Sequence, residues 1–162
     1  GTQLNGAGAE VKMQMNLPAS FQKEFMTILE HYMELKDALV SANEEKAKSV
    51  SKQAVSKLQG LKKSDLDQMT KGHLNKIGEM FNAISNGNEI GNQRDHFVIL
   101  SENIIAISAN LKDIPKPIYV QNCPMANKNK GADWLSWEKE IRNPYYGEAM
   151  MTCGEVKRVL SK

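Results

Sequence analysis

Apolar side chains recur at the period of an α-helix through most of the first 112 residues, and this pattern restricts the fold more than any other feature. In the segment 18–42 their spacing of 4-3-4-3-4 keeps one stripe on one face of a helix. The stripe consists of Phe21, Phe25, Ile28, Tyr32, Leu35 and Leu39. Comparable segments follow at 43–60, 64–85 and 89–112. Four such helices with short connections predict an all-α protein, a four-helix up-and-down bundle.

Residues at the ends of these segments are typical of helix termini. Asn43 precedes two glutamates and is expected to cap a helix, since acids are favourable at the positive end of the helix dipole. Gly60 is expected to end that helix. The segment 64–67 resembles a capping box with Asp in place of Glu. The segment 114–117 contains two prolines and is expected to end the fourth helix, because proline cannot continue the hydrogen-bond ladder.

After the fourth predicted helix the pattern changes. Residues 118–121 are β-prone, whereas residues 131–141 are predicted to form a brief helix that carries both tryptophans. Residues 155–160 fit a second short strand or a final helical turn. We favour a strand paired with 118–121, a two-stranded β element that would bring Cys153 close to Cys123.

A chain of 162 residues is long enough to bury a core in one domain. The expected organisation is a flexible lead-in over residues 1–16 and one helical-bundle domain over residues 17–162. The irregular C-terminal wrap of that domain covers residues 113–162.

Charge and hydropathy exclude two classes of partner. The net charge of +2 is too small to indicate nucleic acid as a partner. No window contains the apolar run of about 20 residues that membrane insertion of a helix requires. The chain opens on Gly1 rather than Met, which is compatible with an export signal that has been removed.

Sulfur-bearing residues gather in the C-terminal third. Cys123 and Met125 are two positions apart, which places them on one side of an extended segment. Met150 and Cys153 are three apart, which places them on one face of a helical turn. Two thiolates and two thioethers form a soft ligand set that selects Cu(I), and by extension Ag(I). Zinc fits less well, because structural zinc sites use Cys and His and rarely Met.

A disulfide between Cys123 and Cys153 is the alternative. It would stabilise the native state by about 3–4 kcal/mol on the chain-entropy model, and the methionines would then fill gaps in the core. The residues alone favour this bridge over the metal site, although reduction of the bridge would restore the thiolate ligands.

His96 lies at the edge of the buried face of the fourth predicted helix. It fits either a supplementary nitrogen ligand or a half-buried histidine bonded to a backbone carbonyl. Cys123 with His96 is the one nucleophile–base pair worth considering as a catalytic site, and no acid or amide stands out to orient it. We therefore expect no enzymatic activity. Arg94 lies on the same helix and is expected to pair with a buried carboxylate, with Asp37 and Glu34 as candidates, or to cap carbonyls of the tail.

Several runs of residues resemble the family called domain of unknown function 3347. In the C-terminal third these are Tyr119-Val-Gln-Asn-Cys-Pro-Met-Ala126, Lys130-Gly-Ala-Asp-Trp-Leu-Ser136, Ile141-Arg-Asn-Pro-Tyr-Tyr-Gly147, Met150 and Cys153-Gly-Glu-Val156. In the helical part they are Tyr32-Met-Glu-Leu-Lys-Asp-Ala-Leu39 and Arg94-Asp-His-Phe97. The resemblance covers about residues 20–160.

That family resembles an exported bacterial domain, found alone or fused to periplasmic adaptors of copper and silver efflux pumps. The resemblance implies a periplasmic, secreted or cell-surface location and a role in heavy-metal homeostasis. Position by position, it implies metal ligands at Cys123, Met125, Met150 and Cys153, with His96 as the helical histidine. With the resemblance added, we place a Cu(I)- or Ag(I)-binding module above a structural or protein-interaction module with a disulfide. An efflux-pump adaptor or a metallochaperone is the expected partner.

Overall fold

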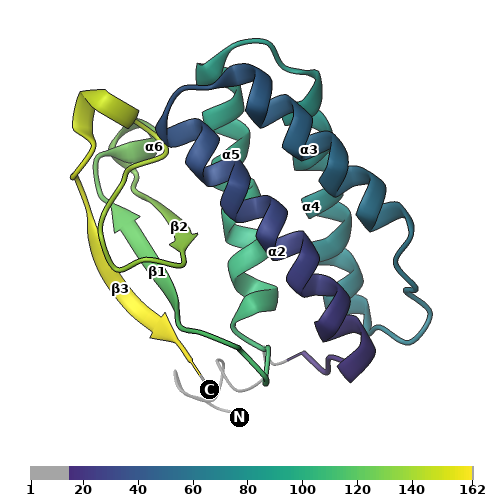
Figure 1. The fold of residues 1–162 in the computed structure, drawn as a ribbon. Coiled ribbons are helices and arrows are strands. Elements are labelled where there is room, and N and C mark those ends of the chain that lie inside the picture. Colours follow the sequence, from purple (N-terminus) through teal and green to yellow (C-terminus); the bar gives the residue numbers. More distant parts are fainter. Residues whose placement is uncertain (1–14, 162) are drawn as a thin grey trace.

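The computed structural model describes residues 15–161, so residues 1–14 of the predicted lead-in lie outside the described part of the chain. Its four long helices are α2 (Ala19–Val40), α3 (Glu44–Gln59), α4 (Gln68–Asn86) and α5 (Ile90–Ser108). Helices that follow one another in the sequence pack side by side, α2 on α3, α3 on α4 and α4 on α5 (Figure 1). The predicted four-helix bundle is confirmed.

Two of the predicted helix termini are confirmed, and one is displaced. Asn43 Oδ1 accepts the Lys46 N–H at 3.0 Å, and Gly60 is the residue at which α3 ends. The cap of α4 is Asp67 rather than Ser64, with Asp67 Oδ1 accepting the Thr70 N–H at 2.8 Å. Because Leu66 is buried ahead of the cap, residues 64–66 belong to the connection that closes the end of the core.

α5 ends at Ser108, ahead of the predicted end at 112 and ahead of the proline pair. Its last turn tightens through a bond from the Asn110 N–H to the Ile107 carbonyl at 2.9 Å. The Asn110 side chain accepts the Met15 N–H at 3.1 Å and donates to the Ala106 carbonyl at 2.9 Å. The helix therefore ends where one asparagine side chain ties it to the beginning of the described chain.

A small antiparallel sheet follows the bundle. Its strands are β1 (Ile118–Cys123), β2 (Ala132–Ser136) and β3 (Glu155–Leu160), in the order β2-β1-β3. The predicted pairing of 118–121 with 155–160 is confirmed, with Ile118 opposite Leu160 and Asn122 opposite Glu155. A register shift between Val120 and Gln121 interrupts this ladder.

The predicted brief helix over 131–141 is wrong, because residues 132–136 form the third strand of the sheet. A tight turn ahead of it contains the short element α6 (Ala126–Asn129), in which Asn127 and Lys128 are left-handed, and Gly131 has φ +87°. This turn reverses the chain and places Trp134 opposite Gln121 of β1. Backbone hydrogen bonding to the edge of β1 therefore overrides the local helical pattern of this segment.

The sheet packs on the bundle through β2, which contacts α5 and α2 (Figure 1). Tyr145 makes ring contacts with both Phe97 and Trp134, with centroids 5.6 Å and 5.9 Å away. The buried Tyr32 hydroxyl lies 2.7 Å from Ser101 Oγ and accepts the Leu135 N–H at 3.1 Å, and burial raises the Tyr32 pKa. Apolar side chains of both parts form one continuous core. Within residues 15–161, none of the helices combines the length and apolarity needed to cross a lipid bilayer.

Candidate functional site

The structure brings Cys123 and Cys153 together, with their Sγ atoms 2.8 Å apart. Both are free cysteines, and Cys123 is fully buried at the end of β1 whereas Cys153 is partly exposed. The separation exceeds the roughly 2.05 Å of a disulfide, and the two thiols are within hydrogen-bonding distance, with either sulfur able to donate. One thiol is therefore anchored in the sheet, and its partner faces the surface.

A glycine next to Cys153 makes this approach possible. Gly154 has φ +135°, and a Cβ atom at this position would lie 2.6 Å from the Asn122 carbonyl oxygen and 3.2 Å from the Trp134 ring. No L side chain fits so close to β1 in this conformation. The bond from the Cys153 N–H to the Met150 carbonyl, 3.1 Å long, closes the preceding turn.

Asn143 fixes the turn that carries Cys153, a role that was not predicted from the sequence. Its side chain is fully buried, with Nδ2 donating to the Cys153 carbonyl at 2.9 Å. Its Oδ1 accepts the Tyr145 N–H at 2.8 Å, and its own N–H donates to the Met151 carbonyl at 2.9 Å. The one available sequence signal was the Asn-Pro pair, which is common where turns begin.

The two methionines lie close in sequence to the cysteines, Met125 after Cys123 and Met150 before Cys153. Met125 follows β1 by two residues, its side chain is 46% exposed, and its carbonyl accepts the Tyr146 hydroxyl at 2.6 Å. Met150 is partly exposed at the end of the 3-10 helix η1 (Gly147–Met150). The described contact between Met125 and the pair runs through its backbone N–H, which bonds to the Cys153 thiol group.

The shared environment of the two thiols raises the pKa of Cys153 above its ordinary value. The hydrogen bond with Cys123 is the main cause, followed by burial and by repulsion from the charged form of Cys123. The Met125 N–H acts in the opposite direction, because it stabilises the thiolate.

His96 is half-buried on α5, one position before Phe97. The Tyr145 ring contacts both Phe97 on α5 and Trp134 on β2, and the Trp134 ring in turn lies beside Gly154, the neighbour of Cys153. A series of aromatic contacts thus runs from Phe97 on α5 to the turn that carries Cys153. Within residues 15–161, no group of three or more His, Cys, Asp and Glu residues gathers in a metal-binding arrangement.

Arg94 donates hydrogen bonds to backbone carbonyls, which was one of the two roles predicted for it. Its Nε donates to the Pro144 carbonyl at 2.8 Å and its Nη2 to the Leu39 carbonyl at 2.6 Å. The alternative of a carboxylate partner is wrong, and Asp37 instead pairs with Lys36 at 2.8 Å. Arg94 bonds to backbone carbonyls rather than to a carboxylate because the last turn of α2 and the turn at Pro144 both place a carbonyl oxygen at its guanidinium.

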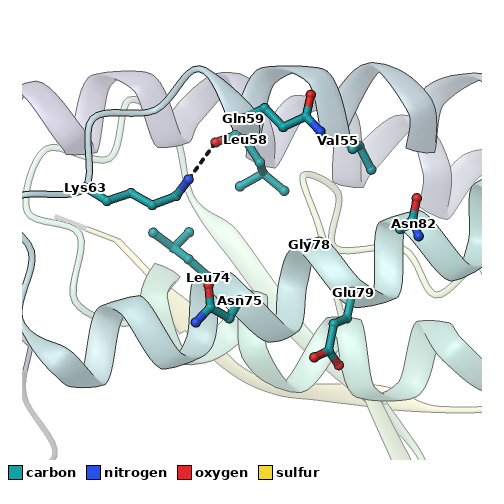
Figure 2. A pocket seen from close by; sticks show the side chains of 9 residues that line it. All are labelled: Val55, Leu58, Gln59, Lys63, Leu74, Asn75, Gly78, Glu79 and Asn82. Carbon is teal, nitrogen blue, oxygen red and sulfur yellow. Dashed lines mark hydrogen bonds between the residues drawn. The ribbon is translucent and has the colours of Figure 1, made fainter.

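A separate pocket of about 410 Å³ lies between α3 and α4 (Figure 2). Leu58 and Leu74 face each other across it, and Lys63 Nζ donates to the Leu58 carbonyl at 3.1 Å. Its lining residues are Val55, Leu58, Gln59, Lys63, Leu74, Asn75, Gly78, Glu79 and Asn82, which include none of the predicted site residues.

Comparison with protein families gives one match, to a family described as protein of unknown function (DUF3347), over residues 28–116. This range is more than half of the chain and contains most of α2, all of α3, α4 and α5, and His96. It ends before β1, so both cysteines and the two candidate methionines lie outside it. Comparisons with curated proteins and with solved structures give no match.

Proposed function

This chain belongs to the DUF3347 family, and from that premise we propose that it is a module that binds Cu(I) or Ag(I) outside the cytoplasm. It would buffer the ion or pass it to a partner in heavy-metal homeostasis or efflux. The observation that carries the proposal is the approach of Cys123 Sγ and Cys153 Sγ to 2.8 Å, with both cysteines free.

The chemistry of the pair supports a soft monovalent ion. Thiolates are soft ligands, and soft ligands select Cu(I) over the harder divalent cations. Met125 follows Cys123 by two positions and Met150 precedes Cys153 by three, and each would add thioether sulfur as the ion enters. His96 lies on α5 rather than on the segments that carry the sulfur residues, so the proposal assigns ligation to the sulfur residues and keeps His96 as a supplementary group.

Entry of an ion requires the two sulfur atoms to move apart. A metal–thiolate bond is about 2.3 Å long for zinc, and thiolates lie at a wide angle across a bound ion, whereas these sulfur atoms are 2.8 Å apart. Cys123 is fixed in β1, so the movement falls to the turn that carries Cys153. The partly exposed position of Cys153 also leaves room for a partner's ligand to attack the ion.

The same distance favours a second function, a structural or protein-interaction module with a Cys123–Cys153 disulfide and no metal. Two thiols 2.8 Å apart need little movement to form the bond. Oxidation would release two protons and pass two electrons to an external oxidant such as another disulfide. A protein partner would then recognise the surface of the C-terminal segment.

Competition for Cu(I) tests the first proposal. The reduced protein is titrated against a chromogenic Cu(I) chelator, beside a Cys123→Ser, Cys153→Ser double variant. We expect the wild type to withdraw one ion per chain and the double variant to withdraw none. Equal competition by both proteins would eliminate the metal site.

Methionine variants test the thioether ligands. Met125→Leu and Met150→Leu should each weaken Cu(I) binding, whereas Met80→Leu on α4 should leave it unchanged.

Mass spectrometry of the protein isolated from an oxidising compartment tests the disulfide alternative, because a disulfide lowers the mass by two hydrogen atoms. A disulfide present in every molecule of the isolated protein would support the structural module.

A further inference from the structure

A second pocket, distinct from the cysteine pair, lies where the end of α2 meets the 142–151 loop. Its volume is about 470 Å³, and its lining includes two arginines, Arg94 and Arg142. The apolar part of the wall is formed by Val40, Tyr146 and Met151, among others. The pocket therefore combines concentrated positive charge with an apolar surface.

The guanidinium of Arg94 is held in place before any ligand arrives. Its bonds to the carbonyls of Leu39 and Pro144 fix one side of the group. A Cβ atom on Gly147 would lie 2.7 Å from Arg94 Nη2 and 3.0 Å from the Val40 carbonyl oxygen, so the glycine leaves the space that the guanidinium occupies. A guanidinium carries five N–H donors, and the described bonds leave Nη1 available.

Neither arginine has a carboxylate partner among residues 15–161. The ion pairs in this part of the chain join Lys36 to Asp37, Lys62 to Asp65, Lys76 to Glu79 and Lys157 to Asp133. Burial lowers the pKa of Arg94, which reflects a charge that is only partly compensated by its surroundings. Both arginines are half-buried, so solvent screens them less than it screens a surface charge.

The negative groups near the pocket limit the charge of an occupant. The end of α2 contributes a partial negative charge of roughly one half, and Glu148 lines the pocket as an exposed residue. These groups oppose a dianion more strongly than a monoanion. The apolar wall further favours an organic acid over an inorganic anion.

We propose that this pocket binds a monocarboxylate with an apolar body. The carboxylate lies between Arg94 and Arg142, where guanidinium groups bind carboxylates through paired hydrogen bonds. The apolar body packs on Val40, Tyr146 and Met151. The inference does not depend on metal binding, because neither cysteine lines the pocket.

Titration of the full chain with phenylacetate tests this proposal. Binding is monitored by isothermal titration calorimetry and by amide chemical shifts. We expect saturable binding, with shifts centred on residues 142–151, and no binding of the neutral phenylacetamide. N-acetyl-leucylleucine and its C-terminal amide show whether the end of a peptide chain is accepted as well as a free acid. Tighter binding of phosphate than of phenylacetate, or equal binding of acid and amide, would overturn the assignment.

Arg142→Gln is the decisive variant, because the Arg142 side chain makes none of the described hydrogen bonds or ion pairs. We expect its dissociation constant for phenylacetate to rise by about tenfold or more, with unchanged unfolding. Arg94→Lys keeps the charge but loses the paired geometry, so we expect weaker binding than wild type. Arg158→Gln on the exposed face of β3 is the matched control and should bind as the wild type does. Unchanged affinity in Arg142→Gln would contradict the proposal.

Discussion

In the bundle, large apolar side chains such as Phe25, Phe81 and Leu100 are fully buried against one another over four helices. In the C-terminal segment, single polar residues and glycines hold the chain at defined points, with Asn143 and Gly154 as the main examples. Stability in the first region is spread over many similar contacts, whereas the cysteine pair depends on a few contacts that have no substitute. Substitutions of equal size should therefore have unequal effects in the two regions.

The largest expected contrast is between two glycines. Gly154→Ala places a Cβ atom 2.6 Å from the Asn122 carbonyl at φ +135°, and we expect a loss of about 3 kcal/mol or more in the free energy of unfolding. Gly72→Ala on the exposed surface of α4 meets nothing within 4 Å, and we expect a gain of up to about 1 kcal/mol. Urea unfolding of both variants measures the difference. Similar losses in the two variants would break the contrast.

Asn143→Ala is next in size. It leaves the Cys153 carbonyl and the Tyr145 N–H without their partner, and we expect a loss of about 2–3 kcal/mol. The freed turn should also make the Cys153 thiol react faster with a disulfide reagent in the native protein. Asn86→Ala is the control, because the exposed Asn86 side chain bonds only to the Asn82 carbonyl one turn earlier. It should change the free energy of unfolding by no more than about 0.5 kcal/mol. The rate at which the Cys153 thiol reacts should stay that of the wild type.

Tyr145→Phe tests the contact between the two regions. The Tyr145 hydroxyl donates to the Asp133 carbonyl of β2 at 2.6 Å and lies 3.4 Å from Ser101 Oγ on α5. Its removal should cost about 1 kcal/mol, because the partly buried carbonyl loses its donor and the contact with Ser101 is lost. Tyr119→Phe on the half-buried position of β1 should lie within about 0.5 kcal/mol of wild type. If thermal unfolding gives the same stability for both variants, this hydroxyl does not join the sheet to the bundle.

The smallest effect concerns pH. The pKa of Cys153 is raised above its ordinary value of 9.0 in the folded protein. The folded state therefore holds this proton more tightly than the unfolded chain, so the contribution is present below pH 9 and is lost as pH rises through the raised pKa. In the reduced protein, stability should fall in this alkaline range, and Cys153→Ser should remove that part of the slope. A slope that is identical in wild type and variant would show that the contact with Cys123 does not raise the pKa of Cys153.

Local rules were sufficient for much of the fold. The 3.6-residue period and the caps at Asn43 and Gly60 predicted the bundle and two of its helix ends, because these signals act within a few residues of each other. The pairing of 118–121 with 155–160 was also predicted, and with it the approach of Cys153 to Cys123. The metal ligands stay a prediction, since the structure places the two sulfur atoms together without deciding what joins them.

The sequence by itself determined the elements whose stability is local: four amphipathic helices, their apolar faces, and two cysteines on segments able to pair. Tertiary structure alone decided the third strand, since residues 132–136 extend only because β1 offers them a ladder. It also decided the roles of Asn143 and Arg94, whose partners lie up to 55 positions away. Such contacts depend on where distant backbone carbonyls meet in space, and no periodic pattern in the chain records that position.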